Sequence, residues 1–177
     1  MIIKDYLFEY ITNSERKFQK LIAQSNFAEI IEDVLENCYD KVISMDKKEE
    51  SIAILGTGLL HYLLTSALIT SQRKIEFQEI QLDIVIPDVK TLKADPKKTL
   101  IICIPKTIDK KEIKQKMEEL QKIQPNKENI WLVLTEKLDF DNETYVIEKN
   151  SSFSKIIYDI AQFVNVNTQN KFKILRL

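Results

Sequence analysis

Between residues 81 and 135, three short apolar runs rich in β-branched residues are interrupted by a single charged, amphipathic stretch. The runs are LDIVIP at 82–87, TLIICIP at 99–105 and WLVLT at 131–135, and DKKEIKQKMEELQKI at 109–123 separates the last two. Runs of this kind are typical of buried strands. Apolar residues at three-and-four spacing in the charged stretch predict a helix, capped by Thr107 or Asp109. Strands and a helix in this order predict an α/β layer structure.

The first 46 residues have a purely helical pattern, which predicts an appended helical arm. A chain of 177 residues that is 44% apolar is long enough for one sizeable core but short for two. We therefore expect an arm at 1–46, a charged bridge at 46–50 and an α/β domain at 51–177. The arm carries an apolar stripe larger than one small sheet face needs, which predicts a homodimer contact through Leu7, Ile11, Phe18, Leu21, Ile31 and Leu35.

Within the α/β domain, turn residues and periodicity set the expected elements. We expect a helix from about Leu59 to Ser71, strands at 74–80, 81–87 and 99–105, a loop at 87–98, strands at 131–135 and 145–149, a helix at 152–164 and an edge strand at 171–177.

Composition excludes several classes of function. A formal charge of −1 gives no overall field that attracts nucleic acid or anionic lipid, so any such surface must be local. Cys38 and Cys103 lack metal-site spacing and predict two buried thiols, and a single histidine, His61, argues against most histidine-based catalysis. Charges in the first ten residues argue against a signal peptide, and 52–69 is too polar for a span, so we expect a cytoplasmic protein without membrane contact.

The order helix, strand, strand, strand, helix, strand between residues 59 and 135 resembles the common core of the PD-(D/E)XK nuclease superfamily, which includes restriction enzymes and archaeal Holliday-junction resolvases. The resemblance implies a restriction-endonuclease-like αβββαβ core with a mixed sheet. In that family an aspartate on the second strand and an acid-x-lysine triplet on the third hold magnesium and help activate water. It implies Asp83 and Lys106 as the catalytic pair, and Asp83 with Asp88 as metal ligands.

This sequence departs from the family at one position, because alignment on Lys106 places Ile104 where the metal-binding acid is expected. We therefore expect a degenerate nuclease core without a cofactor, which serves as a nucleic-acid-associated or protein-interaction module. The enzyme alternative is a magnesium-dependent endonuclease that uses Asp83 and Lys106. A further alternative pairs Asp83 with Lys74 or Lys106 in a purely structural ion pair. Phosphate contacts are expected from Lys90, Lys93, Lys97, Lys98 and Lys110.

A third hypothesis rests on the stretch IAILGTGLLHYLL at 52–64, which resembles the strand–turn–helix opening of a dinucleotide-binding fold. In this hypothesis Gly56, Thr57 and Gly58 form a turn whose backbone amides bind a pyrophosphate. The third glycine of that motif is replaced by His61, and the next strands follow without a crossover helix.

Overall fold

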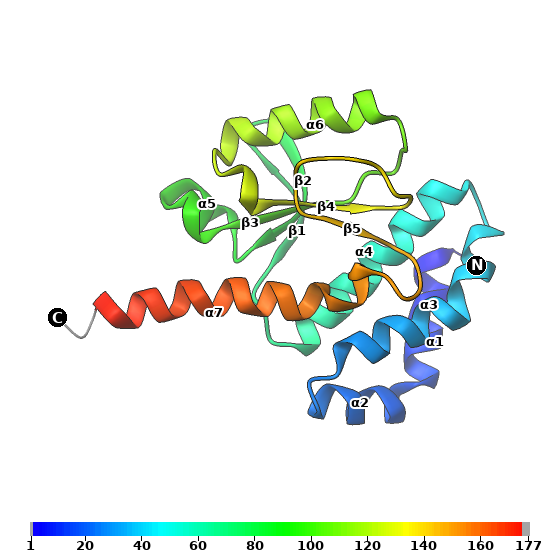
Figure 1. Ribbon diagram of the computed structural model, residues 1–177. Helices are drawn as coiled ribbons and strands as arrows, with labels where there is room; N and C mark the ends of the chain where they lie inside the picture. Colours follow the sequence, from blue (N-terminus) through cyan, green and yellow to red (C-terminus); the bar gives the residue numbers. More distant parts are fainter. Residues whose placement is uncertain (1, 175–177) are drawn as a thin grey trace.

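A mixed sheet of five strands forms the centre of the computed structural model, which describes residues 2–174 (Figure 1). The strands lie in chain order across the sheet: β1 (Gln72–Phe77), β2 (Ile80–Ile86), β3 (Leu100–Cys103), β4 (Ile130–Leu134) and β5 (Thr144–Val146). β1, β2 and β3 are antiparallel neighbours, whereas β3, β4 and β5 run parallel. The prediction of an α/β chain with a mixed sheet is confirmed.

The strands that contain Asp83 and Ile102 are antiparallel neighbours. Ile84 lies opposite Ile102 in an antiparallel register, and Ile86 lies opposite Leu100. The connection between these strands is more ordered than the predicted loop, because it contains α5 (Val89–Ala94) and a 3₁₀ turn at Pro96–Lys98. Asp88 starts α5 by accepting a hydrogen bond from the Thr91 N–H at 2.7 Å.

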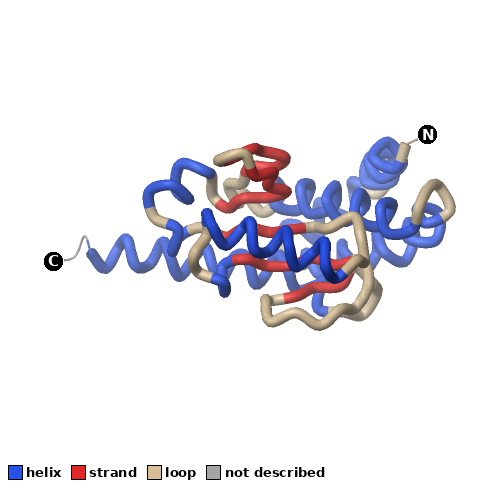
Figure 2. The backbone as a smooth tube through the Cα atoms, turned by 90° about the horizontal axis from the view of Figure 1, so that it is seen from above, coloured by secondary structure: helices blue, strands red, loops and turns tan. Residues whose placement is uncertain are grey.

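One face of the sheet is covered by α6 (Lys110–Ile123), which joins the parallel strands β3 and β4, and by α5 (Figures 1 and 2). Of the two predicted caps, Asp109 is the N-cap: its carboxylate accepts from the N–H groups of Lys111 and Glu112 at 2.9 and 3.4 Å. The helix packs its apolar face, Ile113, Met117, Leu120 and Ile123, against Ile101, Cys103, Leu132 and Leu134 of the sheet.

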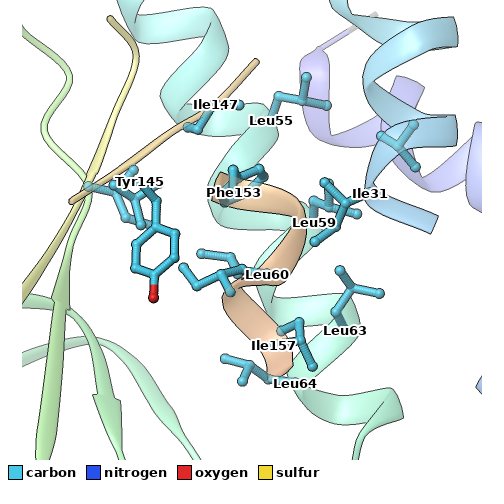
Figure 3. Packing of buried hydrophobic residues seen from close by; sticks show 14 of the residues in the cluster. Ile31, Leu55, Leu59, Leu60, Leu63, Leu64, Tyr145, Ile147, Phe153 and Ile157 are labelled. Atoms are coloured by element: carbon cyan, nitrogen blue, oxygen red, sulfur yellow. The ribbon is translucent and has the colours of Figure 1, made fainter. Parts of the chain in front are cut away.

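The opposite face is covered by the remaining helices: α1 (Ile3–Asn13), α2 (Glu15–Ala23), α3 (Phe27–Ile43), α4 (Lys48–Ser66) and α7 (Ile156–Ile174). Ile102, Val133 and Tyr145 point to this side, so the side chains of successive strand residues pack into opposite layers. Figure 3 shows Leu55, Leu59 and Leu63 of α4 within this layer, with Ile147 and Ile157. The sheet is thus the middle of three layers.

Residues 1–46 do not form a separate arm surface. The predicted stripe is covered within one chain, because Leu7, Phe18, Leu21, Ile31 and Leu35 are buried in the same cluster as the sheet, with Ile11 packed against it. The surplus of apolar surface from which we predicted a homodimer contact is therefore not present on this stripe. The reason is that α1 and α3 pack against α4, and α2 packs against α1 and α3.

The bounds predicted for α4 are wrong at both ends. Residues 48–50, expected in a charged bridge, form its first turn, and the helix ends at Ser66 rather than at Ser71. Gly56 and Gly58 lie inside the helix, so the predicted turn at 56–58 does not exist. Each glycine permits close packing: an added Cβ at Gly56 would lie 2.5 Å from Ile147 Cδ1, and one at Gly58 would lie 2.9 Å from Leu7 Cδ2. The third hypothesis needs a pyrophosphate-binding loop at 56–58, and the structure has a helix there instead.

The C-terminal part departs from the predicted edge strand. A 3₁₀ turn at Ser152–Lys155 leads into α7, which runs to Ile174 without an intervening glycine or proline to end it. Residues 171–174 are therefore helical, and 175–177 lie outside the described residues. Within the described part of the chain, no helix has both the length and the apolar character needed to cross a membrane.

Candidate functional site

The candidate site is centred on Asp83, which lies in the middle of β2 and is partly buried. Its carboxylate Oδ2 accepts a hydrogen bond of 2.7 Å from the backbone N–H of Ile104. Ile104 directly follows β3, so the antiparallel pairing of β2 with β3 places this N–H beside Asp83. Lys106 follows two residues later, and the two residues predicted as a catalytic pair therefore belong to one site.

The carboxyl group of Asp83 has a perturbed affinity for its proton. Burial raises the pKa of Asp83 above its ordinary value, and this effect outweighs the Ile104 N–H bond, which lowers the pKa. Lys116, Lys106 and Lys74 also lower it by electrostatic attraction. The carboxylate thus accepts one backbone hydrogen bond and lies in the electrostatic field of three lysines, rather than in a single ion pair with Lys74 or Lys106.

Lysines from three parts of the fold act on this carboxylate, and further cations lie next to one of them. Lys74 lies opposite Asp83, because the flanking residues of β1, Arg73 and Ile75, pair with Ile84 and Leu82. Lys116 of α6 donates a hydrogen bond of 2.6 Å from its Nζ to the carbonyl oxygen of Gln81, which lies two residues before Asp83.

Lys4 of α1 completes the set. Its proximity lowers the pKa of Lys74, through a contact between the two side chains and through charge repulsion. Burial, Arg73 and Lys106 lower the pKa of Lys74 further. We name these residues, Lys4, Arg73, Lys74, Lys106 and Lys116, the cationic cluster. All except the partly buried Lys116 are exposed.

The residues at Asp83 do not fit the magnesium ion that the family resemblance implies. Magnesium takes about six oxygen ligands in near-octahedral geometry, usually including one or two carboxylates. Asp83 is a single carboxylate, and one of its oxygens already accepts a hydrogen bond from the Ile104 N–H. Ile104 stands where the family has its second acid, and its side chain is apolar and 4% exposed. Among the described residues, no three or more histidine, cysteine, aspartate or glutamate side chains form a group that could hold a metal ion.

Asp88, predicted as a second metal ligand, lies just after the C-terminal end of β2, and the β1–β2 turn lies at the other end of this strand. Its carboxylate caps α5, and the hydrogen bonds to Thr91 lower the pKa of Asp88. The structure therefore gives Asp88 a helix-capping role and does not bring it into the Asp83 site.

The lysines predicted to contact phosphate fall in two separate places. Lys90 and Lys93 lie on α5, and Lys97 and Lys98 lie on the following 3₁₀ turn, where Lys98 forms an ion pair of 3.4 Å with Asp95. Lys110, at the start of α6, places its Nζ 5.5 Å from the centre of the Phe140 ring. None of these residues belongs to the cationic cluster around Asp83.

The two thiols are buried, and the single imidazole is partly buried. Cys38 and Cys103 are buried free thiols, as predicted. Burial raises the pKa of Cys38 to about 11, so this thiol stays protonated at neutral pH. His61 is partly buried on α4, and its pKa is lowered first by burial and then by Arg73.

A large groove of about 1100 Å³ opens at a different place, between α7, the start of α3, the segment after α4 and the segments on both sides of α5. Its walls include Leu68, Pro87, Lys98 and Tyr158, and they include no residue of the cationic cluster. The groove is therefore separate from the Asp83 site.

Sequence reasoning missed Lys4 and Arg73, and it considered Lys74 only as an ion-pair partner. A signal for Lys74 exists in the sequence, since a two-residue turn after Phe77 places residue 74 opposite residue 83. Lys4 gives no such signal, because only the packing of α1 brings it there.

Comparison with known protein families, curated proteins and solved structures finds no match for this chain.

Proposed function

We propose that the chain is a restriction-endonuclease-like domain that binds nucleic acid through the cationic cluster and does not cut it. The order and direction of α4, β1, β2, β3, α6 and β4 support the αβββαβ part of this proposal. The positions of Asp83 in the second strand and of Lys106 after the third strand support it as well.

The observation that carries the proposal is a single carboxylate surrounded by an excess of cations. Lys4, Arg73, Lys74, Lys106 and Lys116 bring more positive charge than Asp83 can compensate. Exposed lysines held together in this way repel one another, and an anionic ligand relieves this repulsion. The phosphate groups of a nucleic acid backbone supply such anions at a regular spacing.

The same residues disfavour cleavage. A lysine that activates water in this type of core works beside a metal ion held by two acids, and here Ile104 replaces one of them. Lys106 instead lies among other cations, where a phosphate contact is the favourable interaction.

Fluorescence anisotropy with labelled oligonucleotides at several salt concentrations tests the binding. The double variant Lys74→Ala, Lys106→Ala should weaken binding, and each lost phosphate contact should reduce the slope of log K against log salt by roughly 0.7 to 0.9. The matched control is Lys90→Ala, Lys93→Ala on α5, which also removes two lysines but leaves the cluster intact. A loss confined to the control variant would place the binding surface on α5 and contradict the proposal.

Asp83→Asn separates binding from catalysis. Because Asp83 competes with phosphate for the cations, the neutral asparagine should tighten binding while it keeps an acceptor for the Ile104 N–H. A metal-dependent nuclease would respond in the opposite way, losing its cleavage of the same oligonucleotides in magnesium. Cleavage by the unmodified protein that Asp83→Asn abolishes would establish the enzyme alternative. If the protein neither binds nor cuts, the fold acts as a protein-interaction scaffold.

A further inference from the structure

An exposed aromatic side chain lies at the margin of the cationic cluster. Phe8 is 71% exposed on α1, one helical turn after Lys4. Residues four apart lie on the same face of a helix, with Cβ atoms about 5–6 Å apart. Lys4 in turn lies against Lys74 of β1. Phe8 is therefore beside Lys4, and through Lys4 it lies near Lys74 on the edge strand of the sheet.

The orientation of α1 keeps Phe8 at this surface. The preceding residue, Leu7, is buried and packs against Gly58 of α4, and Ile3 is buried on the same side. Phe8 then points away from the core on the flank that also carries Lys4. In Figure 2, the helix at the N-terminus and the β1–β2 hairpin lie along the same side of the molecule.

A single exposed phenylalanine is ordinary on a protein surface, and its position beside a cluster of cations is the feature that needs a reason. Binding sites for single-stranded nucleic acid combine these two elements: cations contact the backbone, and an aromatic ring stacks on a base. In a duplex the faces of the bases already stack on one another, so the ring of Phe8 finds no partner there. The cluster is also compact, since Lys74, Lys106 and Lys116 all act on the Asp83 carboxylate and Lys4 and Arg73 both act on Lys74.

We infer that the cationic cluster and Phe8 form a site for an unpaired strand, in which a phosphate lies on Lys74 and Lys106 and an adjacent base stacks on the Phe8 ring. This inference rests on the proposed function and names its ligand class: single-stranded DNA or RNA rather than duplex.

The test compares single-stranded and duplex oligonucleotides of equal length by fluorescence anisotropy. Phe8→Ala should weaken single-strand binding about 5-fold to 150-fold, the range of one base–aromatic stack, and leave duplex binding unchanged. Phe8→Tyr should keep the affinity, and Phe8→Leu should lose it although it stays apolar. The matched control is Tyr158→Ala on α7, which removes another exposed aromatic ring, 65% exposed, away from the cluster.

A second readout reports stacking directly. Phe8→Trp adds an exposed indole, whereas the native Trp131 is 8% exposed, so quenching of the added fluorescence by single strands should be large and quenching by duplex small. Equal effects of Phe8→Ala on single strands and duplex would overturn the inference while leaving the proposed function standing. Absence of binding to either ligand by the unmodified protein would overturn both. Because Phe8 is exposed, circular dichroism of each variant should match that of the unmodified protein.

Discussion

Replacing Gly56 by alanine tests whether the glycines of α4 serve packing. Alanine is about 1 kcal/mol better than glycine in a helix interior, so a helix-propensity argument alone predicts stabilisation. In this structure the new methyl group would lie 2.5 Å from Ile147 Cδ1 and 3.3 Å from Cγ1. Ile147 has little room to move, because its side chain is fully buried and its N–H donates to the Leu134 carbonyl at 2.9 Å (Figure 3).

Overpacking of a core costs about 1–3 kcal/mol, and this site belongs in the upper part of that range. After the propensity gain, Gly56→Ala should lower the free energy of unfolding by about 1–2 kcal/mol, equivalent to about 2–8 °C in Tm. Ile147→Val removes the clashing Cδ1 and should itself cost about 1 kcal/mol. In the Ile147→Val background, Gly56→Ala should then stabilise by about 0.5–1 kcal/mol.

Urea denaturation followed by circular dichroism measures all four members of this double-mutant cycle. Gly58→Ala is the control, because its Cβ would lie 2.9 Å from the end of the Leu7 side chain alone; the propensity gain and the cost of moving Leu7 should offset each other, and we expect a change close to zero. Additive effects of Gly56→Ala and Ile147→Val, with a coupling below about 0.5 kcal/mol, would refute the packing explanation.

Two further predictions concern the Asp83 site and its hairpin. Because burial raises the pKa of Asp83, its contribution to stability is complete below the unfolded value of about 4 and is lost as the pH rises through the folded value. The free energy of unfolding of Asp83→Asn should therefore equal that of the unmodified protein near pH 3 and exceed it toward neutral pH. A difference that is largest in acid would contradict this. Gln78 and Glu79 form the β1–β2 turn with φ of 50° and 64°, where asparagine and glycine are favoured. Gln78→Asn with Glu79→Gly should raise the urea midpoint by an amount equivalent to about 1 kcal/mol at unchanged m-value, and a lower midpoint would show that the turn is not strained.

The elements that sequence predicted well are those governed by short-range chemistry. β2 and β3 follow one another in sequence and pair antiparallel, and the crossover through α6 makes β3 and β4 parallel. Asp109 caps α6 as its position suggested. The same strand pairing explains why the charge of Lys106 acts on Asp83.

The failures share a different cause, which is contact between segments far apart in sequence. Gly56 and Gly58 looked like a turn because glycine is a poor helix former, and only Ile147 and Leu7 explain their place inside α4. The apolar stripe of residues 1–46 was visible, but its partner was not, and α4 of the same chain proved to be that partner. Lys4 belongs to the site only because α1 packs against α4 beside β1.

The position of the cationic cluster at the rim of the sheet has a consequence for solubility. β1 is an edge strand that pairs only with β2, so its outer backbone groups are open to pairing with another chain. Exposed Arg73 and Lys74, together with the left-handed φ of 50° at Lys74, make this edge a poor template for strand addition. The charges that we assign to ligand binding therefore also protect the molecule from aggregation. Variants that neutralise β1 should accordingly be examined by light scattering before their loss of binding is attributed to the site.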